Sequence, residues 1–104
     1  MAKALLFVES RPESPQRIDD YHKWHELTHV PEMLQIEGIM SARRWQGDDD
    51  ESFITLYELD TDIDTAKANL KAALQAGRIS KPVAVKTDPP PVMRYLSLLS
   101  EASA

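Results

Sequence analysis

Two kinds of hydrophobic pattern follow one another along this chain. Short apolar or alternating runs bounded by turn residues predict strands, and they cover Lys3–Ser10, Ile39–Gln46, Ser52–Leu59 and Val92–Ser100. Apolar residues spaced by three and four predict helices from Gln16 to about His29 and from Thr61 to about Leu74. Pro31 predicts a bend near Val30, and Gly77 predicts the end of the second helix. The element order is therefore β-α-β-β-α-β.

The sequence also predicts several of the connections between these elements. The polar run Gly47–Glu51 predicts a hairpin turn between the second and third strands, and Thr61 with Asp64 has the spacing of a helix capping box. Residues 78–86 are either a loop or a short extra element around Val83–Val85. Three consecutive prolines at 89–91 then form a stiff spacer before the last strand.

The element order is that of the split βαβ, or ferredoxin-like, α+β fold. We expect one antiparallel four-stranded sheet with both helices on one face. The strands carry apolar side chains on both alternating faces; in the third strand Phe53 and Tyr57 oppose Ile54 and Leu56. Two helices cover only one face, so the other face must be buried differently. A second copy of the chain is the simplest cover, which predicts a homodimer through the sheet.

Composition narrows the classes of function. With 104 residues, 42% apolar and 28% charged, the chain is expected to be one globular domain over 1–104. The net charge of −5, with the dipeptide Arg43–Arg44 as the basic cluster, argues against nucleic acid as a partner. Cysteine is absent, which excludes disulfides and thiolate metal sites. The apolar run Ala4–Val8 is too short for a signal segment or membrane span, so we expect a cytoplasmic protein without a membrane partner.

Four segments combine into a recognisable pattern: Tyr21-x-x-Trp24, His29-Val30-Pro31-Glu32, Gly38 to Arg44 and Phe53 to Leu59. They resemble segments of the dimeric α+β barrel superfamily, in particular of its small bacterial EthD-like and polyketide-cyclase-like members. The resemblance implies protomers paired through their sheets and a pocket between sheet and helices. The chain departs from the family pattern at Glu37-Gly38, where many relatives have proline and glycine, and at His25, where an aromatic residue is common.

All three histidines lie on one predicted helix, at His22, His25 and His29. This spacing places them on one helix face, but a single straight helix rarely brings three imidazoles to one metal ion. We therefore expect no metal, with His22 exposed. His29, at the predicted helix end, has two interpretations. It could act as a general acid and base, as the resemblance implies, or it could cap the helix carbonyls.

The remaining candidates surround this helix. Arg43 and Arg44 point to opposite faces of their strand, so only one can face a pocket, where it could bind a carboxylate or enolate; the alternative is a surface ion pair. We expect His25 or Arg43 to assist His29. The aromatic residues could line a ligand cavity or simply form core; they are Tyr21, Trp24, Trp45 and Tyr57.

The resemblance then implies a function. It is a cofactor-independent proton-transfer enzyme, of cyclase, isomerase or dehydratase type, acting on a small aromatic, polyketide-like or lactone-like compound. Two alternatives stay open: a non-catalytic ligand-binding dimer, and a haem- or metal-binding member of the same superfamily. The sequence carries no Gly-rich phosphate loop and no G-x-S-x-G motif, which argues against nucleotide-dependent and serine-hydrolase chemistry.

Overall fold

The four predicted strands form one antiparallel sheet in the order β2-β3-β1-β4. The computed structural model describes residues 3–104. In it the strands are β1 (Ala4–Ser10), β2 (Ile39–Gln46), β3 (Phe53–Leu59) and β4 (Val92–Ser97). The predicted ferredoxin-like α+β fold is confirmed. The last strand is shorter than expected, because β4 ends at Ser97, and the next residues, Leu98 and Leu99, lie outside the strand and are exposed.

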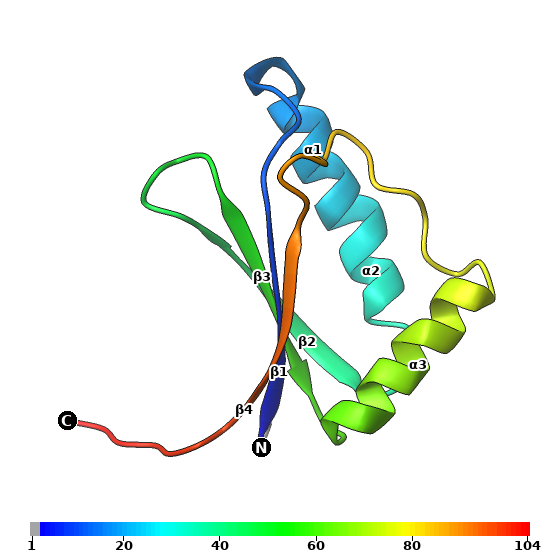
Figure 1. The fold of residues 1–104 in the computed structure, drawn as a ribbon, viewed down its shortest axis with the longest axis vertical. Helices are drawn as coiled ribbons and strands as arrows, with labels where there is room; N and C mark the ends of the chain where they lie inside the picture. Colours follow the sequence, from blue (N-terminus) through cyan, green and yellow to red (C-terminus); the bar gives the residue numbers. More distant parts are fainter. Residues whose placement is uncertain (1–2) are drawn as a thin grey trace.

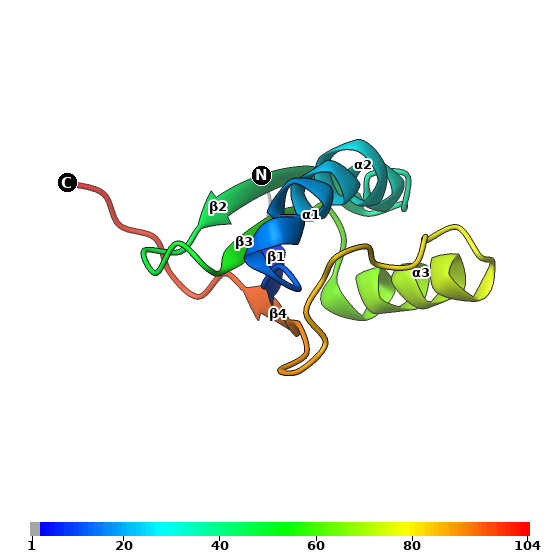
Figure 2. The same ribbon diagram turned by 90° about the horizontal axis from the view of Figure 1, so that it is seen from above.

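The helices lie together on one face of this sheet (Figures 1 and 2). The first helical region comprises the short turn η1 (Pro15–Arg17), α1 (Ile18–Trp24), a wider π-helical turn η2 (His25–His29) and α2 (Val30–Met33). The second is α3 (Ile63–Gln75). Asp62 caps α3 by accepting from the backbone N–H of Thr65 at 2.7 Å, so the cap lies one residue later than the predicted Thr61.

The predicted bend at Val30 is wrong, because the first helical region continues through Pro31 to Met33. In the π-helical turn, hydrogen bonds reach back five residues, and the Val30 N–H donates to the His25 carbonyl. Val30 keeps helical angles of φ −60° and ψ −47°. The wider turn ends at His29, and its capping residue Val30 directly precedes Pro31, which has no N–H to donate. The histidines therefore lie within a continuous helix and not at its end.

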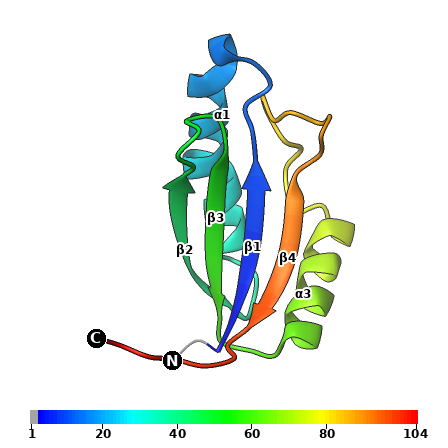
Figure 3. The same cartoon turned by 60° about the vertical axis from the view of Figure 1, so that its left-hand side comes forward.

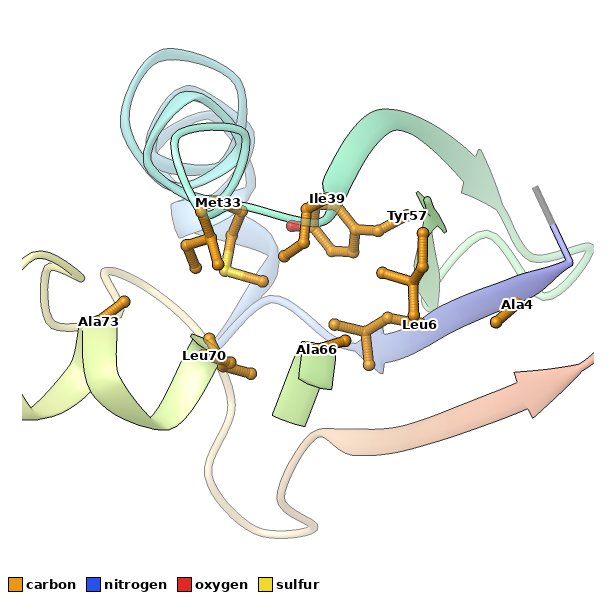
Figure 4. Close-up of a cluster of buried hydrophobic side chains, with 10 residues drawn as sticks. Ala4, Leu6, Met33, Ile39, Tyr57, Ala66, Leu70 and Ala73 are labelled. Carbon is orange, nitrogen blue, oxygen red and sulfur yellow. The ribbon is translucent and has the colours of Figure 1, made fainter. Parts of the chain in front are cut away.

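The main core lies between the sheet and the helices. In β3 every second residue is buried, and the buried set faces the helices, where Leu6 and Tyr57 meet Met33 from α2 and Leu70 from α3 (Figure 4). Leu6 and Tyr57 are each only 1% exposed. A second, smaller cluster at the start of α1 joins Tyr21, Phe53 and Ala84. The sequence periodicity identified these inward positions because a strand alternates between faces.

The segment between α3 and β4 runs beside α1 and α2 (Figure 1). It is held at one end by Ser80, whose backbone N–H and hydroxyl both donate to the Glu32 carboxylate at 3.0 and 2.6 Å. At the other end the Lys86 N–H donates to the Arg11 carbonyl at 2.9 Å. The predicted extra element near Val83–Val85 is only a single bridge between Pro12 and Val85.

The opposite, outer face of the sheet has no helix over it, as Figure 3 shows with the helices behind the strands. Apolar side chains of all four strands lie there, half-buried or exposed: Leu5, Phe7, Trp45, Ile54, Leu56, Val92 and Leu96. Among residues 3–104, no helix has the length and apolar character required to cross a bilayer.

Candidate functional site

The candidate site lies on the sheet-facing side of α1 and η2, next to the smaller apolar cluster, to which Tyr21 belongs. Tyr21 is fully buried, and Trp24 and His25 are 8% and 6% exposed. A buried imidazole next to two buried aromatic rings is costly unless its polar atoms are satisfied. The partners of each ring therefore decide what the site can do.

Tyr21 is fixed at the start of the site. Its hydroxyl lies 2.5 Å from the Ser10 hydroxyl of β1, so one of the two oxygens donates to the other. Burial raises the pKa of Tyr21, and the nearby Arg44 charge opposes that rise. The side chain thus stays protonated at neutral pH and ties the helix to the sheet. Ser10 gave no signal in the sequence, because its partner is eleven residues away.

His25 is held in one tautomer by its own helix. Its Nδ1 lies 2.8 Å from the Tyr21 carbonyl oxygen, which can only accept, so Nδ1 carries the proton and donates. The Nε2 atom is then the proton-free nitrogen. Burial is the main cause that lowers the pKa of His25 to about 4, with smaller contributions from the charges of Arg44 and the other histidines. At neutral pH His25 is an uncharged imidazole.

His29 stacks on Trp24, with ring centroids 4.4 Å apart and planes inclined by 16°. Burial lowers the pKa of His29, and the nearby Glu32 carboxylate opposes this shift. The His29 Nδ1 and the Trp24 Nε1 are both buried without a hydrogen-bond partner among residues 3–104. The predicted cap alternative for His29 is wrong, because the helix continues beyond it to Met33. Unpartnered buried polar atoms of this kind are rare in folded proteins.

His22 lies on the β2 side of the helix and contacts Arg44. The Arg44 Nη2 lies 3.1 Å from the His22 Nδ1, and its Nη1 forms an ion pair with Glu26 at 2.9 Å. Its guanidinium carbon is 5.9 Å from the centroid of the Tyr21 ring. The Arg44 side chain is only 16% exposed, and its Nε is buried without a partner among the described residues.

Arg43 and Trp45, both predicted for the site, do not join the buried histidines. Their backbone partners are Leu56 and Ile54, which point to the outer face of the sheet, and both side chains are exposed. The predicted opposition of Arg43 and Arg44 is correct, but the choice between them is corrected, because Arg44 is the arginine on the histidine side. The cause is an irregular register at the start of β2, where Ile39 and Ser41 pair with the adjacent residues Leu59 and Glu58.

Tyr57 completes the aromatic set on the helix side. It is 1% exposed and belongs to the main core, and burial raises its pKa. Tyr21, Trp24 and Tyr57 therefore share the helix-facing side of the molecule with His25 and His29. Contact of any of them with a ligand stays a prediction.

Metal binding has no preformed site in the part of the chain that the structure describes, where no three His, Asp or Glu side chains are arranged to hold an ion. A surface hollow of about 800 Å³ is lined by residues such as Met40, Asp60 and Ile63 and by no histidine. A smaller cleft of about 380 Å³ borders the histidine cluster instead, lined by His22, Glu26, Arg44, Trp45, Gln46 and Phe53. It is closer to the candidate chemistry than the larger hollow.

Comparison with known proteins bears on the fold. No family model and no curated protein matches the sequence. Among solved structures, Rv0793 from Mycobacterium tuberculosis superposes with a TM-score of 0.61 at 14% identity, over 98% of this chain and 100% of that one. A monooxygenase from the gene ActVA-Orf6 of Streptomyces coelicolor, in complex with the ligand nanaomycin D, gives 0.58 at 11% identity, over 99% and 93%. The chain therefore shares its fold with these two proteins, in agreement with the ferredoxin-like α+β architecture that its sequence predicts.

Proposed function

We propose that this chain is a cofactor-independent enzyme that transfers protons on a small aromatic, polyketide-like compound bound between the first helical region and the sheet. The observation that carries the proposal is the stacked pair of Trp24 and His29. Each ring has a buried polar atom without a partner among the described residues, and both lie next to the uncharged His25. Such atoms are costly to leave unpaired and are satisfied when a ligand supplies the missing partner.

The proposed roles follow from which atoms are free. The Trp24 indole N–H can only donate, so it suits a carbonyl or phenolic oxygen of the ligand. His29 in its uncharged form takes a proton from a hydroxyl or an activated carbon at Nδ1 and returns it at another position. The His25 ring lies edge-on to His29 at 5.9 Å, with its own tautomer fixed by the Tyr21 carbonyl. Tyr57 and Tyr21 form the apolar wall.

Proton exchange on a model substrate tests this proposal. β-Tetralone, a bicyclic aromatic ketone, has acidic hydrogens next to its carbonyl that exchange slowly with deuterium in D₂O. We expect the protein to accelerate this exchange, as followed by mass spectrometry, and we expect nanaomycin D to inhibit it. Binding of nanaomycin D without any acceleration of exchange would contradict catalysis and support the non-catalytic ligand-binding alternative.

Oxygenation is a second candidate, favoured by the fold shared with the ActVA-Orf6 monooxygenase. Removal of a proton from an aromatic hydroxyl would be its first step as well, with His29 in the same role. Naphthohydroquinone separates the two chemistries. Its oxygenation to a hydroxynaphthoquinone consumes one O₂ for each substrate molecule, with one oxygen atom added to the ring, the other released as water and all electrons supplied by the substrate. Proton exchange consumes no O₂. An oxygen electrode measures this directly, with buffer alone as the control for spontaneous oxidation.

We also propose that the outer face of the sheet joins two copies of the chain. Exposed or half-buried apolar side chains from all four strands lie there, whereas the other face is covered by the helices. We expect Leu56→Asp, on the central strand β3, to convert the dimer to a monomer in native mass spectrometry. The interface would otherwise bury a carboxylate without a partner. Leu27→Asp is the matched control, since Leu27 is 75% exposed on the helix. A wild-type monomer would refute the dimer.

A further inference from the structure

We infer that Arg44, held by Glu26, is a positioning residue that fixes the tautomer of His22 and keeps His22 and His25 uncharged. The contacts of Arg44 with His22 and Glu26 are observed in the structure and do not depend on any assumed function. The relevance of Arg44 to catalysis rests on the proposed function, in which His29 accepts the proton next to an uncharged His25.

The tautomer of His22 follows from the donor properties of arginine. A guanidinium group has five N–H donors and no acceptor, and it stays charged at all ordinary pH values. The contact of 3.1 Å between the Arg44 Nη2 and the His22 Nδ1 therefore requires an unprotonated Nδ1. The remaining proton is on Nε2. His25 has the opposite tautomer, because its Nδ1 donates to the Tyr21 carbonyl.

Glu26 determines where the guanidinium lies. Its carboxylate accepts from the Arg44 Nη1 at 2.9 Å, from one helical turn beyond His22. Glu26 is well exposed, whereas the Arg44 side chain is 16% exposed, so the positive charge is the better shielded from water. An ion pair with one shielded partner holds its geometry better than two fully exposed side chains.

The charge of Arg44 then acts on both histidines. Burial and the Arg44 charge lower the pKa of His22, whereas Glu26 and Asp19 raise it. At His25, burial and Arg44 lower the pKa together with His22 and His29, and the Tyr21 carbonyl raises it. The Tyr21 ring is close to both groups, 5.9 Å from the Arg44 guanidinium carbon and 4.4 Å from the His25 ring.

This arrangement has a consequence for a proton-transfer site. An imidazole beside a fixed positive charge is uncharged before substrate binds and releases quickly any proton that it takes up. Arg44 would thus disfavour a charged His22 or His25 beside His29. It does so without contact with substrate, which is why it is a positioning residue.

Nitrogen-15 NMR of the imidazole rings tests the inference without any substrate. In Arg44→Gln we expect the pKa values of His22 and His25 to rise and His22 to lose its preference for the Nε2–H tautomer. Arg44→Lys keeps the charge, so the His25 titration should stay close to wild type. Arg43→Gln is the matched control, because it removes the same charge from the next residue on the opposite face. Unchanged titrations in Arg44→Gln, or equal shifts in Arg43→Gln, would overturn the inference.

Glu26→Gln gives a second test of opposite sign, which does not depend on the folding of the arginine variants. Removal of the carboxylate leaves the arginine charge uncompensated, so the pKa of His22 should fall further. A rise would contradict the electrostatic role. Because these titrations need no ligand, absence of tetralone exchange together with the expected NMR shifts would reject the proposed function and leave the role of Arg44 intact.

Discussion

Replacement of His29 by alanine is expected to slow the protein-catalysed exchange of β-tetralone by about 100- to 10,000-fold, the usual contribution of a general acid–base group. The variant loses the one imidazole nitrogen that is buried without a partner among the described residues. Removal of a ring that stacks on Trp24 also costs packing, so thermal unfolding must be measured beside the rate. A rate loss in a variant that is still folded supports the catalytic role.

The pH dependence of the exchange adds a second criterion. A base works in its proton-free form, and the pKa of His29 is lowered from its ordinary value of 6.5. The wild-type kcat/KM should therefore be level above pH 6.5 and fall only below it. Thr28→Ala, at the preceding residue of the same π-helical turn, is the control for damage to the helix and should retain the rate. Equal rates in wild type and His29→Ala would show that His29 is not the base.

The sequence predicted the sheet well because strand periodicity is a local property. The alternation in Phe53–Leu59 identifies the face that is buried, and the limits predicted for the second strand agree with Ile39–Gln46. The strand order then follows from the element order, since few arrangements of β-α-β-β-α-β bury both helices. The fold could therefore be predicted from hydrophobic periodicity and element order alone.

The sequence could not show which of Arg43 and Arg44 faces the helices, because the pairing of β2 with β3 shifts by one residue. If β2 alternated regularly from the buried Ile39, then Arg43 and Trp45 would share its inward face. The irregular pairing of Ile39 and Ser41 with adjacent residues of β3 reverses this parity. A bulge leaves no clear mark in a strand without glycine, so periodicity could not reveal which arginine joins the histidines.

The helix shows a second limit of local reasoning. Proline disfavours helical geometry in the residue before it, which is why a bend at Val30 was predicted. The π-helical turn His25–His29 removes the conflict, and it also sets the stacking of His29 on Trp24. Contacts between distant residues, such as Ser10 with Tyr21 and Glu26 with Arg44, depend on the assembled fold and have no signature in the sequence.

Acidification is expected to remove about 3 kcal/mol of stability through His25 alone. Its pKa falls from 6.5 to about 4 in the folded protein, a difference that corresponds to this free energy. Above pH 6.5 His25 is uncharged in both the folded and the unfolded chain, so it has no effect. Between pH 6.5 and about pH 4 only the unfolded chain binds the proton, and the free energy of unfolding falls by about 1.4 kcal/mol per pH unit.

The contribution of His25 is isolated by comparison with His25→Gln, whose side chain does not titrate and still offers an N–H to the Tyr21 carbonyl. The free energy of unfolding from urea titrations, at one fixed protein concentration, should fall more steeply with acid in wild type than in this variant. Carboxylates titrate equally in both proteins and cancel. The same comparison for His22→Gln should give a smaller difference, because the half-exposed His22 ring can be charged at lower cost. Parallel pH curves for wild type and His25→Gln would mean that His25 is protonated as easily in the folded chain as in water. The site would then lack the uncharged imidazole that the proposed function requires.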